Sequence, residues 1–286
     1  MKATNWSIKK ERSKLLKSER HSFYMLGLVL AFIALLIGFG NHKRIQFKAY
    51  ESPYKLQRYQ TMNFKKENLH QKSFYMEYED ELYYTIPGID VSEHNREIDW
   101  QKVAKSGIKF AFIRIGFRGY GSGDIYLDST FEANYKGATA NGIKVGVYFF
   151  SQAINMEEAK QEAQFVLKAL NGRALDLAVV YDMEVIYGDE ARTDNLTSQN
   201  WNAHAIAFCE TVKHGGYRPM IYTNLRQAHK YYDYQLINRY PLWMAQYHEE
   251  MEYEYPVHIW QYSDTGAVPG INTYTDLNMY FLKKQK

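Results

Sequence analysis

The chain has 286 residues, of which 46% are hydrophobic and 16% aromatic, and this composition is enough to bury the core of one large domain. The formal charge of +3 is unevenly distributed, because residues 1–84 carry 15 Lys or Arg against 8 Asp or Glu, whereas residues 85–286 carry 20 against 24. This distribution argues against nucleic-acid binding, which needs cations clustered on a folded face. The single cysteine, Cys209, excludes an internal disulfide.

One long uncharged run marks the N-terminal part of the chain. Residues 23–40 read FYMLGLVLAFIALLIGFG, and about 18 residues at a rise of about 1.5 Å nearly cross the hydrocarbon core of a bilayer. Residues 1–22 hold seven Lys or Arg against two Glu, which favours a cytoplasmic N-terminus. We therefore predict a basic tail over 1–22, a transmembrane helix over 23–40 and a cell-membrane location with the rest of the chain outside. Secretion after signal cleavage is the alternative, although no AxA-like site precedes Asn41.

Residues 41–83 are rich in Lys, Gln, Glu and Tyr, with one proline and no glycine. This composition predicts a stalk between the membrane segment and a domain over 84–286. Aromatic residues in the stalk favour short helical pieces that pack on themselves or on the domain over full disorder.

Eight short apolar runs follow, each bounded by turn residues, and each predicts a β-strand. They cover residues 86–92, 109–115, 144–150, 177–185, 218–223, 241–247, 257–262 and 275–281. Amphipathic stretches separate the earlier runs. Asp99, Asp128 and Asn155 are placed to cap the first three helices, and a fourth helix is expected over about 198–214, ending at Gly215.

Strands separated by helices pair in parallel, and eight strands with helices mainly in the first five intervals predict a modified TIM-like βα barrel of the α/β class. An open doubly wound sheet is the structural alternative. In a barrel the active site lies at the carboxyl ends of the strands, which directs attention to acidic residues that end apolar runs.

Four acidic residues occupy such positions: Asp90, Asp182, Glu184 and Asp276. Because strand side chains alternate, Asp182 and Glu184 project from the same face, about 6 to 7 Å apart, above Val180. Two semi-buried carboxyls resist double ionisation, and the less solvated one keeps its proton to higher pH, as a general acid requires. The DxE spacing is also compatible with a loop-edge pair or a set of metal ligands.

An ordered series of motifs from about residue 86 to 282 resembles the glycoside hydrolase family 25 lysozymes. The series reads GIDVSEHN, IDWQKVAKSGIKFAFIRIGFRG, GVYFF, VVYDMEV, MIYTN, LWMAQY, IWQYSDTGAVPGI and DLN. The resemblance implies a modified barrel that cleaves the β-1,4 bond between N-acetylmuramic acid and N-acetylglucosamine in peptidoglycan. It implies that Glu184 protonates the leaving oxygen, that Asp182 assists the substrate 2-acetamido group, and that Asp90 and Asp276 complete the acidic cluster. Many relatives have histidine where this chain has Phe149.

Aromatic and amide residues at other strand ends suit a glycan groove, since Tyr and Trp offer a flat face and a polar edge to sugar rings. The candidate substrate-binding residues are Tyr148, Tyr222, Gln261, Trp243, Trp260 and Tyr247. Packing in the barrel core is the alternative for each aromatic residue. The histidines show no HxxxH or HExxH spacing, so we expect neither a metal nor a cofactor.

Two other functions fit a barrel with this acidic cluster. A chitinase-like glycosidase usually has a DxxDxDxE strand, which needs acidic residues where this chain has Leu177 and Val180. A non-catalytic glycan-binding envelope protein has no reason to retain all four acidic residues. The sequence therefore favours a peptidoglycan hydrolase.

Overall fold

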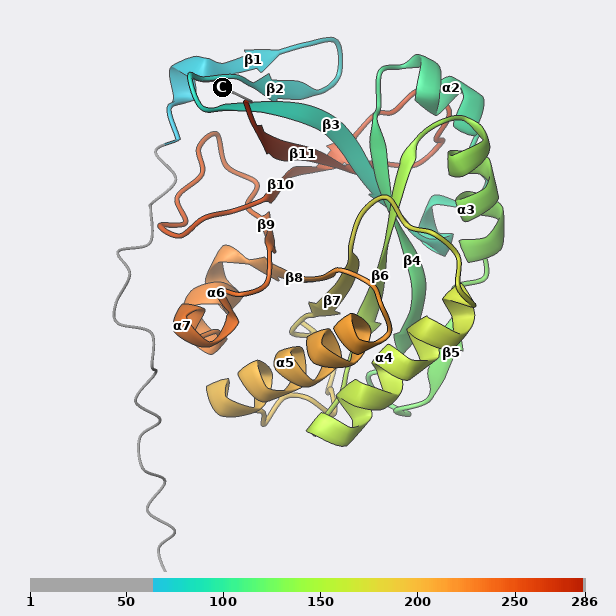
Figure 1. The fold of residues 1–286 in the computed structure, drawn as a ribbon, viewed down its shortest axis with the longest axis vertical. Coiled ribbons are helices and arrows are strands. Elements are labelled where there is room, and N and C mark those ends of the chain that lie inside the picture. The colour runs from blue at the N-terminus through green and yellow to red at the C-terminus, as the bar shows by residue number, and fades with distance from the viewer. Residues whose placement is uncertain (1–63, 285–286) are drawn as a thin grey trace, which may run out of the picture. The chain divides into compact units, whose positions relative to one another are not determined.

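The computed structural model describes residues 64–284, and its centre is a closed β-barrel (Figure 1). The barrel strands are, in chain order, β3 (Tyr83–Val91), β4 (Phe110–Arg118), β6 (Lys144–Ser151), β7 (Val179–Met183), β8 (Pro219–Asn224), β9 (Leu242–Ala245), β10 (Ile259–Gly266) and β11 (Thr275–Lys283). Each overlaps one of the eight predicted runs. The sheet order is β3-β11-β10-β9-β8-β7-β6-β4, and pairing of β3 with β4 closes it. Closure excludes the open doubly wound sheet.

The strands are not all parallel. Neighbours from β3 through β4, β6, β7, β8 and β9 to β10 pair in parallel, as predicted, but β11 runs antiparallel to both β10 and β3. Only a short connection joins β10 to β11, and a parallel return needs a crossover of a dozen or more residues. The short strand β5 (Ile125–Leu127) extends the edge of β4.

Six α-helices lie in the first five intervals between barrel strands: α2 (Trp100–Lys105), α3 (Phe131–Ala140), α4 (Met156–Leu170), α5 (Ser198–His214), α6 (Leu225–Tyr231) and α7 (Tyr234–Ile237). A 3-10 turn, η2 (Glu93–Asn95), follows β3. In Figure 1, α3, α4 and α5 lie along the outside of the barrel.

Side-chain caps begin two of the predicted helices. Asp99 accepts from the Lys102 backbone N–H and Asn155 accepts from that of Glu158. The prediction for Asp128 was wrong, since α3 begins after Thr130. Asp128 is buried instead, and its carboxylate binds the Arg114 guanidinium at 2.7 Å. Its other carboxylate oxygen still accepts from the Thr130 backbone N–H at 2.9 Å, so Asp128 bonds the residue before the helix rather than the first turn.

The barrel divides the core in two. Inside it, large side chains such as Phe110, Phe112 and Trp243 pack together, while a second, larger cluster fills the space between the barrel and its helices. Gly146 leaves room for the interior rings, because a Cβ there would lie 2.3 Å from the ring of Phe112. Strand alternation thus assigns every second residue to the interior and the others to the helix layer.

The last part of the predicted stalk belongs to the folded unit. Residues 64–82 contain a 3-10 turn, η1 (Lys66–Asn68), and a two-stranded sheet of β1 (Leu69–Gln71) and β2 (Met76–Tyr78). The Phe64 ring stacks on Tyr78 at 4.9 Å and meets Trp260 edge-on at 5.3 Å. Strand β2 of this hairpin lies against β3 and β11, so residues 64–82 belong to the same compact unit as the barrel.

No helix within residues 64–284 is both long and apolar enough to span a membrane. The predicted tail (1–22), transmembrane helix (23–40) and first part of the stalk (41–63) lie outside the described residues.

Candidate active site

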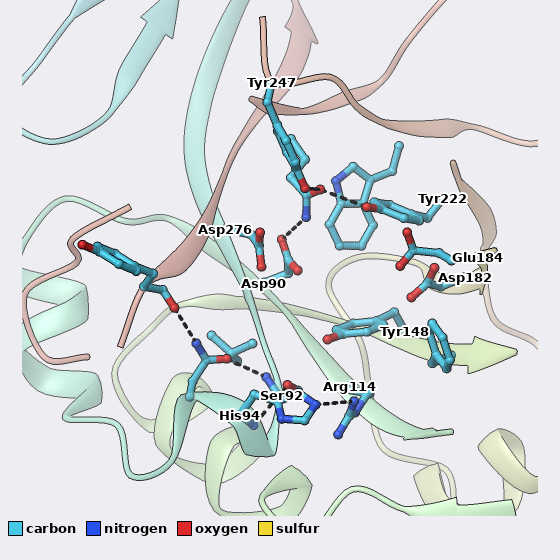
Figure 2. Close-up of a pocket in the computed structure, with 16 residues that line it drawn as sticks. Asp90, Ser92, His94, Arg114, Tyr148, Asp182, Glu184, Tyr222, Tyr247 and Asp276 are labelled. Atoms are coloured by element: carbon cyan, nitrogen blue, oxygen red, sulfur yellow. Dashed lines mark hydrogen bonds between the residues drawn. The ribbon is translucent and has the colours of Figure 1, made fainter. Parts of the chain in front are cut away.

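A pocket of about 370 Å³ opens at the carboxyl end of the parallel strands. All four predicted acidic residues line it: Asp90, Asp182, Glu184 and Asp276. In Figure 2, Asp90 and Asp276 face Asp182 and Glu184 across the pocket. The strands therefore bring together carboxyls that are up to 186 positions apart in the sequence.

The end of β7 supplies one carboxyl pair. Asp182 is buried within the strand, Glu184 follows the strand and is half-buried, and both side chains point into the pocket (Figure 2). Val180 lies in the barrel interior below them, as the alternation predicted. The Oδ1 atom of Asp182 is buried and has no hydrogen-bond partner among the described residues, so it is free to accept a bond from a ligand.

The second carboxyl pair comes from β3 and β11, where Asp90 and Asp276 are directly opposite in the ladder. Because β11 is antiparallel, its first residues lie at the same barrel end as the last residues of β3. The Oδ2 atom of Asp90 accepts a hydrogen bond from Asn278 at 2.7 Å and another from Gln261 at 2.9 Å. Asp90 is thus the acceptor at the centre of a buried network.

Burial dominates the protonation of these groups. It raises the pKa of Glu184 to about 7, with a further rise from the charge of Asp90. Burial, followed by the charges of Glu184 and Asp90, raises the pKa of Asp182 well above its ordinary value. Burial also raises the pKa of Asp90 to about 6, against its hydrogen bonds, and that of Asp276 to about 9, with the charge of Asp90 as the next cause. The cluster therefore holds several protons near neutrality.

Five of the six predicted substrate-binding residues line the pocket: Tyr148, Tyr222, Gln261, Trp243 and Tyr247. The hydroxyls of Tyr222 and Tyr247 donate to Gln261 Oε1 at 3.0 and 2.9 Å. Trp243 is 1% exposed and packs on Phe112, so it forms mainly the floor. Tyr247 is 48% exposed and offers the most accessible aromatic surface of the five.

Trp260 does not reach the pocket. It neighbours Gln261 on β10, and because Gln261 points inward, alternation directs Trp260 outward. Its ring is fully buried among Phe64 and Tyr262, and its Nε1 donates to the Gln246 carbonyl oxygen at 2.7 Å. The prediction that both neighbours bind substrate conflicted with the strand geometry.

We expect Trp260→Phe to lower the free energy of unfolding by about 1–3 kcal/mol, since it removes a buried hydrogen bond and indole volume. The KM for glycan should stay within about two-fold. Tyr247→Ala should show the reverse pattern, a higher KM with little loss of stability. Thermal melts measure the stability of each variant and initial rates measure its KM. A raised KM in Trp260→Phe would indicate that Trp260 contacts the substrate after all.

Arg114 also lines the pocket, although its place there was not predicted from the sequence. Its guanidinium binds Asp128 and, at 2.8 Å, Glu93, and its Nη1 lies 3.4 Å from Nε2 of His94. Arg114 is the one charged residue in the apolar run FAFIRI, and strand alternation places it on the same interior face as Phe110 and Phe112. This pattern could have predicted an arginine inside the barrel. Phe149 by contrast points into the helix layer, so it removes no polar group from the pocket.

No group of three or more His, Cys, Asp or Glu side chains in residues 64–284 could hold a metal ion. The pocket contains carboxyls with different pKa values, surrounded by tyrosine and amide groups. Such a set can donate a proton to a leaving oxygen and stabilise positive charge at a sugar carbon.

The sequence profile of Glycosyl hydrolases family 25 matches residues 89–271. The chain belongs to this family. YegX, an uncharacterized protein of Escherichia coli strain K12, is 31% identical to this family 25 hydrolase over 213 residues, which are 69% of this chain and 70% of YegX. The autolytic lysozyme of Clostridium acetobutylicum is 27% identical over 196 residues, which are 68% of this chain and 56% of that enzyme.

Solved structures share the fold of this family 25 hydrolase. The bacterial lysozyme from Streptomyces coelicolor superposes with a TM-score of 0.56 at 25% identity, covering 68% of this chain and 91% of that one. A family 25 glycosyl hydrolase from Bacillus anthracis has a TM-score of 0.59 at 22% identity, covering 74% and 92%. The modular autolysin LytC of Streptococcus pneumoniae, solved with a synthetic peptidoglycan ligand, has a TM-score of 0.60 at 23% identity, and the match covers 69% of this chain but 47% of LytC.

Proposed function

We propose that this family 25 hydrolase is a lysozyme that cleaves the β-1,4 bond between N-acetylmuramic acid and N-acetylglucosamine in peptidoglycan. The observation that carries the proposal is the cluster of four buried or half-buried carboxyls in one pocket, with a pKa of about 7 at Glu184. Family membership and the similarity to the autolytic lysozyme of Clostridium acetobutylicum support the substrate class.

In this mechanism Glu184 gives its proton to the glycosidic oxygen as the bond from that oxygen to C1 breaks. The acetamido oxygen of the same sugar attacks C1, and Asp182, with its free Oδ1, accepts a hydrogen bond from the acetamido nitrogen. Glu184 then takes a proton from water, which attacks C1 and restores the acetamido group. Asp90, which carries the charge of its pair with Asp276, stabilises the positive charge at C1, and the tyrosines, Trp243 and Gln261 hold the sugars.

The identity of the new reducing end tests this proposal. Purified cell walls incubated with the protein should lose turbidity, and muramic acid should appear at the reducing end of the fragments. N-acetylglucosamine at that end would instead identify a glucosaminidase, and binding without cleavage would identify a non-catalytic glycan-binding protein.

The pH dependence follows from the raised pKa values. A general acid must be protonated, so activity should fall about ten-fold per pH unit once the pH rises well above about 7, the pKa of Glu184. Activity should also fall as the pH drops below about 6, where Asp90 loses the charge that stabilises the sugar cation. Initial rates over a series of buffers at constant ionic strength measure both limbs. Full activity retained at pH 9 would contradict this role of Glu184.

We also propose that residues 23–40 anchor the protein in the cytoplasmic membrane, with the basic tail inside and the hydrolase outside. A tethered hydrolase has a high local concentration at its own cell wall, which suits local remodelling. A reporter fused after Lys286 should be active only outside the cytoplasm, and the mature protein should retain residues 1–40. A reporter inserted after Arg20 provides the cytoplasmic control. A mature N-terminus at or near Asn41 would replace the anchor with a cleaved signal peptide.

A further inference from the structure

The residue after β6 lies beside the residue after β7. These strands pair in parallel register up to Ser151 and Met183, so Gln152 and Glu184 follow at the next position. Gln152 is fully buried, and its side-chain Nε2 donates to the backbone carbonyl oxygen of Glu184 at 3.0 Å. The Gln152 side chain therefore adds one hydrogen bond beyond the end of the β6–β7 ladder, and this bond holds the backbone of Glu184.

Gln152 also holds the far end of the loop that starts at Glu184. Its Oε1 accepts from the Thr193 hydroxyl at 2.9 Å, and its backbone oxygen accepts from Arg192 Nη1 at 3.2 Å. The Arg192 guanidinium makes two bonds to the Glu158 carboxylate on α4, at 2.7 and 2.9 Å. Segment 184–193 is thus fastened to Gln152 at both ends.

The carboxyl of Glu184 depends on this attachment. Within residues 64–284, hydrogen bonding contributes nothing to its pKa shift, which comes from burial and from the charge of Asp90. The backbone at residue 184 and the surrounding packing therefore set where the carboxyl lies. Proton transfer needs the donor within hydrogen-bond reach of the leaving oxygen, and a misplacement of about 1 Å can cost about 100-fold in rate.

We propose that Gln152 is a positioning residue: its buried side-chain amide fixes the backbone of Glu184 and thereby aims the carboxyl at the scissile bond. This inference rests on the proposed role of Glu184 as the acid. The charge of Asp90 acts on Glu184 from β3. Substitution of Gln152 leaves in place all the other titratable or charged residues that line the pocket: Asp90, His94, Arg114, Tyr148, Asp182, Tyr222, Tyr247, Tyr274 and Asp276.

The test compares two glutamine substitutions in the full-length protein. Gln152→Met removes the amide but keeps the volume. Gln227→Met is the matched control, because Gln227 on α6 is also buried, at 1% exposure, and its amide has no partner among the described residues. Gln152→Met should lower kcat by about 10- to 100-fold, leave KM within about two-fold and move the alkaline limb of the pH–rate profile to lower pH, since a released carboxyl is better solvated. Gln227→Met should change none of these.

A second variant and an NMR titration test the same role of Gln152 by other means. If thermal melts show that Gln152→Met is unfolded, Thr193→Val, which removes only one bond to Gln152, should shift the same limb by a smaller amount. If the wild-type protein has no muramidase activity, the proposed function fails. A carbon-13 NMR titration of the Glu184 carboxyl, assigned by its loss in Glu184→Gln, then tests the positioning role alone. An unchanged kcat and titration in Gln152→Met, or an equal loss in Gln227→Met, would overturn the inference.

Discussion

Glu184→Gln should abolish hydrolysis, lowering the rate by about 10² to 10⁴, while the fold and glycan binding stay nearly intact. The amide has the size and shape of the carboxyl but carries no acidic proton for the leaving oxygen. Because Glu184 is half-buried in a pocket of acidic residues, removing its charge should not destabilise the barrel. Release of soluble fragments from purified walls measures the rate, and co-sedimentation with the same walls measures binding.

Glu190→Gln is the control, since Glu190 is exposed in the same loop and lies outside the pocket lining. It should retain wild-type activity. If Glu184→Gln kept more than about a tenth of the wild-type rate, another group would have to supply the proton.

Asp182→Asn should also lower activity strongly, but without changing which bond is cut. In the proposed mechanism Asp182 aligns the substrate acetamido group, and no covalent bond forms between the enzyme and the sugar. An asparagine amide can turn its NH2 group instead of an oxygen toward the acetamido nitrogen, so the acetamido group loses its alignment. Burial and the nearby charge of Glu184 hold the wild-type carboxyl under electrostatic strain, so the substitution should not lower the melting temperature.

Three measurements decide the role of Asp182. Asp176→Asn is the matched control, because Asp176 precedes the same strand at the opposite end of the barrel and its carboxylate accepts from the Val145 backbone N–H at 3.1 Å. Wild-type protein should cleave de-N-acetylated glycan poorly, and mass spectrometry of trapped reactions should find no sugar attached to the protein. A sugar linked to Asp182, or efficient cleavage of de-N-acetylated glycan, would favour a retaining mechanism with Asp182 as nucleophile.

The protonation pattern also explains why the pocket needs so many buried carboxyls. Asp90 and Asp276 lie directly opposite each other in the ladder, and the higher pKa of Asp276 leaves Asp90 as the group that carries charge. That charge raises the pKa of Glu184 across the pocket. In the proposed mechanism the negative charge of Asp90 would therefore serve twice, by keeping Glu184 protonated and by stabilising a cationic sugar.

Local patterns determined much of this protein. The apolar runs predicted all eight barrel strands, because a strand buried on both faces needs continuous apolar residues. The period of two placed Asp182 and Glu184 on one face, and the capping positions Asp99 and Asn155 followed from turn chemistry. These features depend on residues within a few positions of each other, and the ordered motifs identified the family.

Contacts between distant segments were decided only by the tertiary structure. The reversal of β11 placed Asp276 opposite Asp90, and Asp128 joins Arg114 of β4 to Thr130, the residue before α3. Residues 64–82 packed on a bare side of the barrel, where Phe64 meets the outward-facing Trp260. In the same way, Gln152 gained its position only when β6 and β7 lay side by side. Each outcome depends on which surfaces remain uncovered once the barrel closes, and that is a property of the whole packed core rather than of local periodicity.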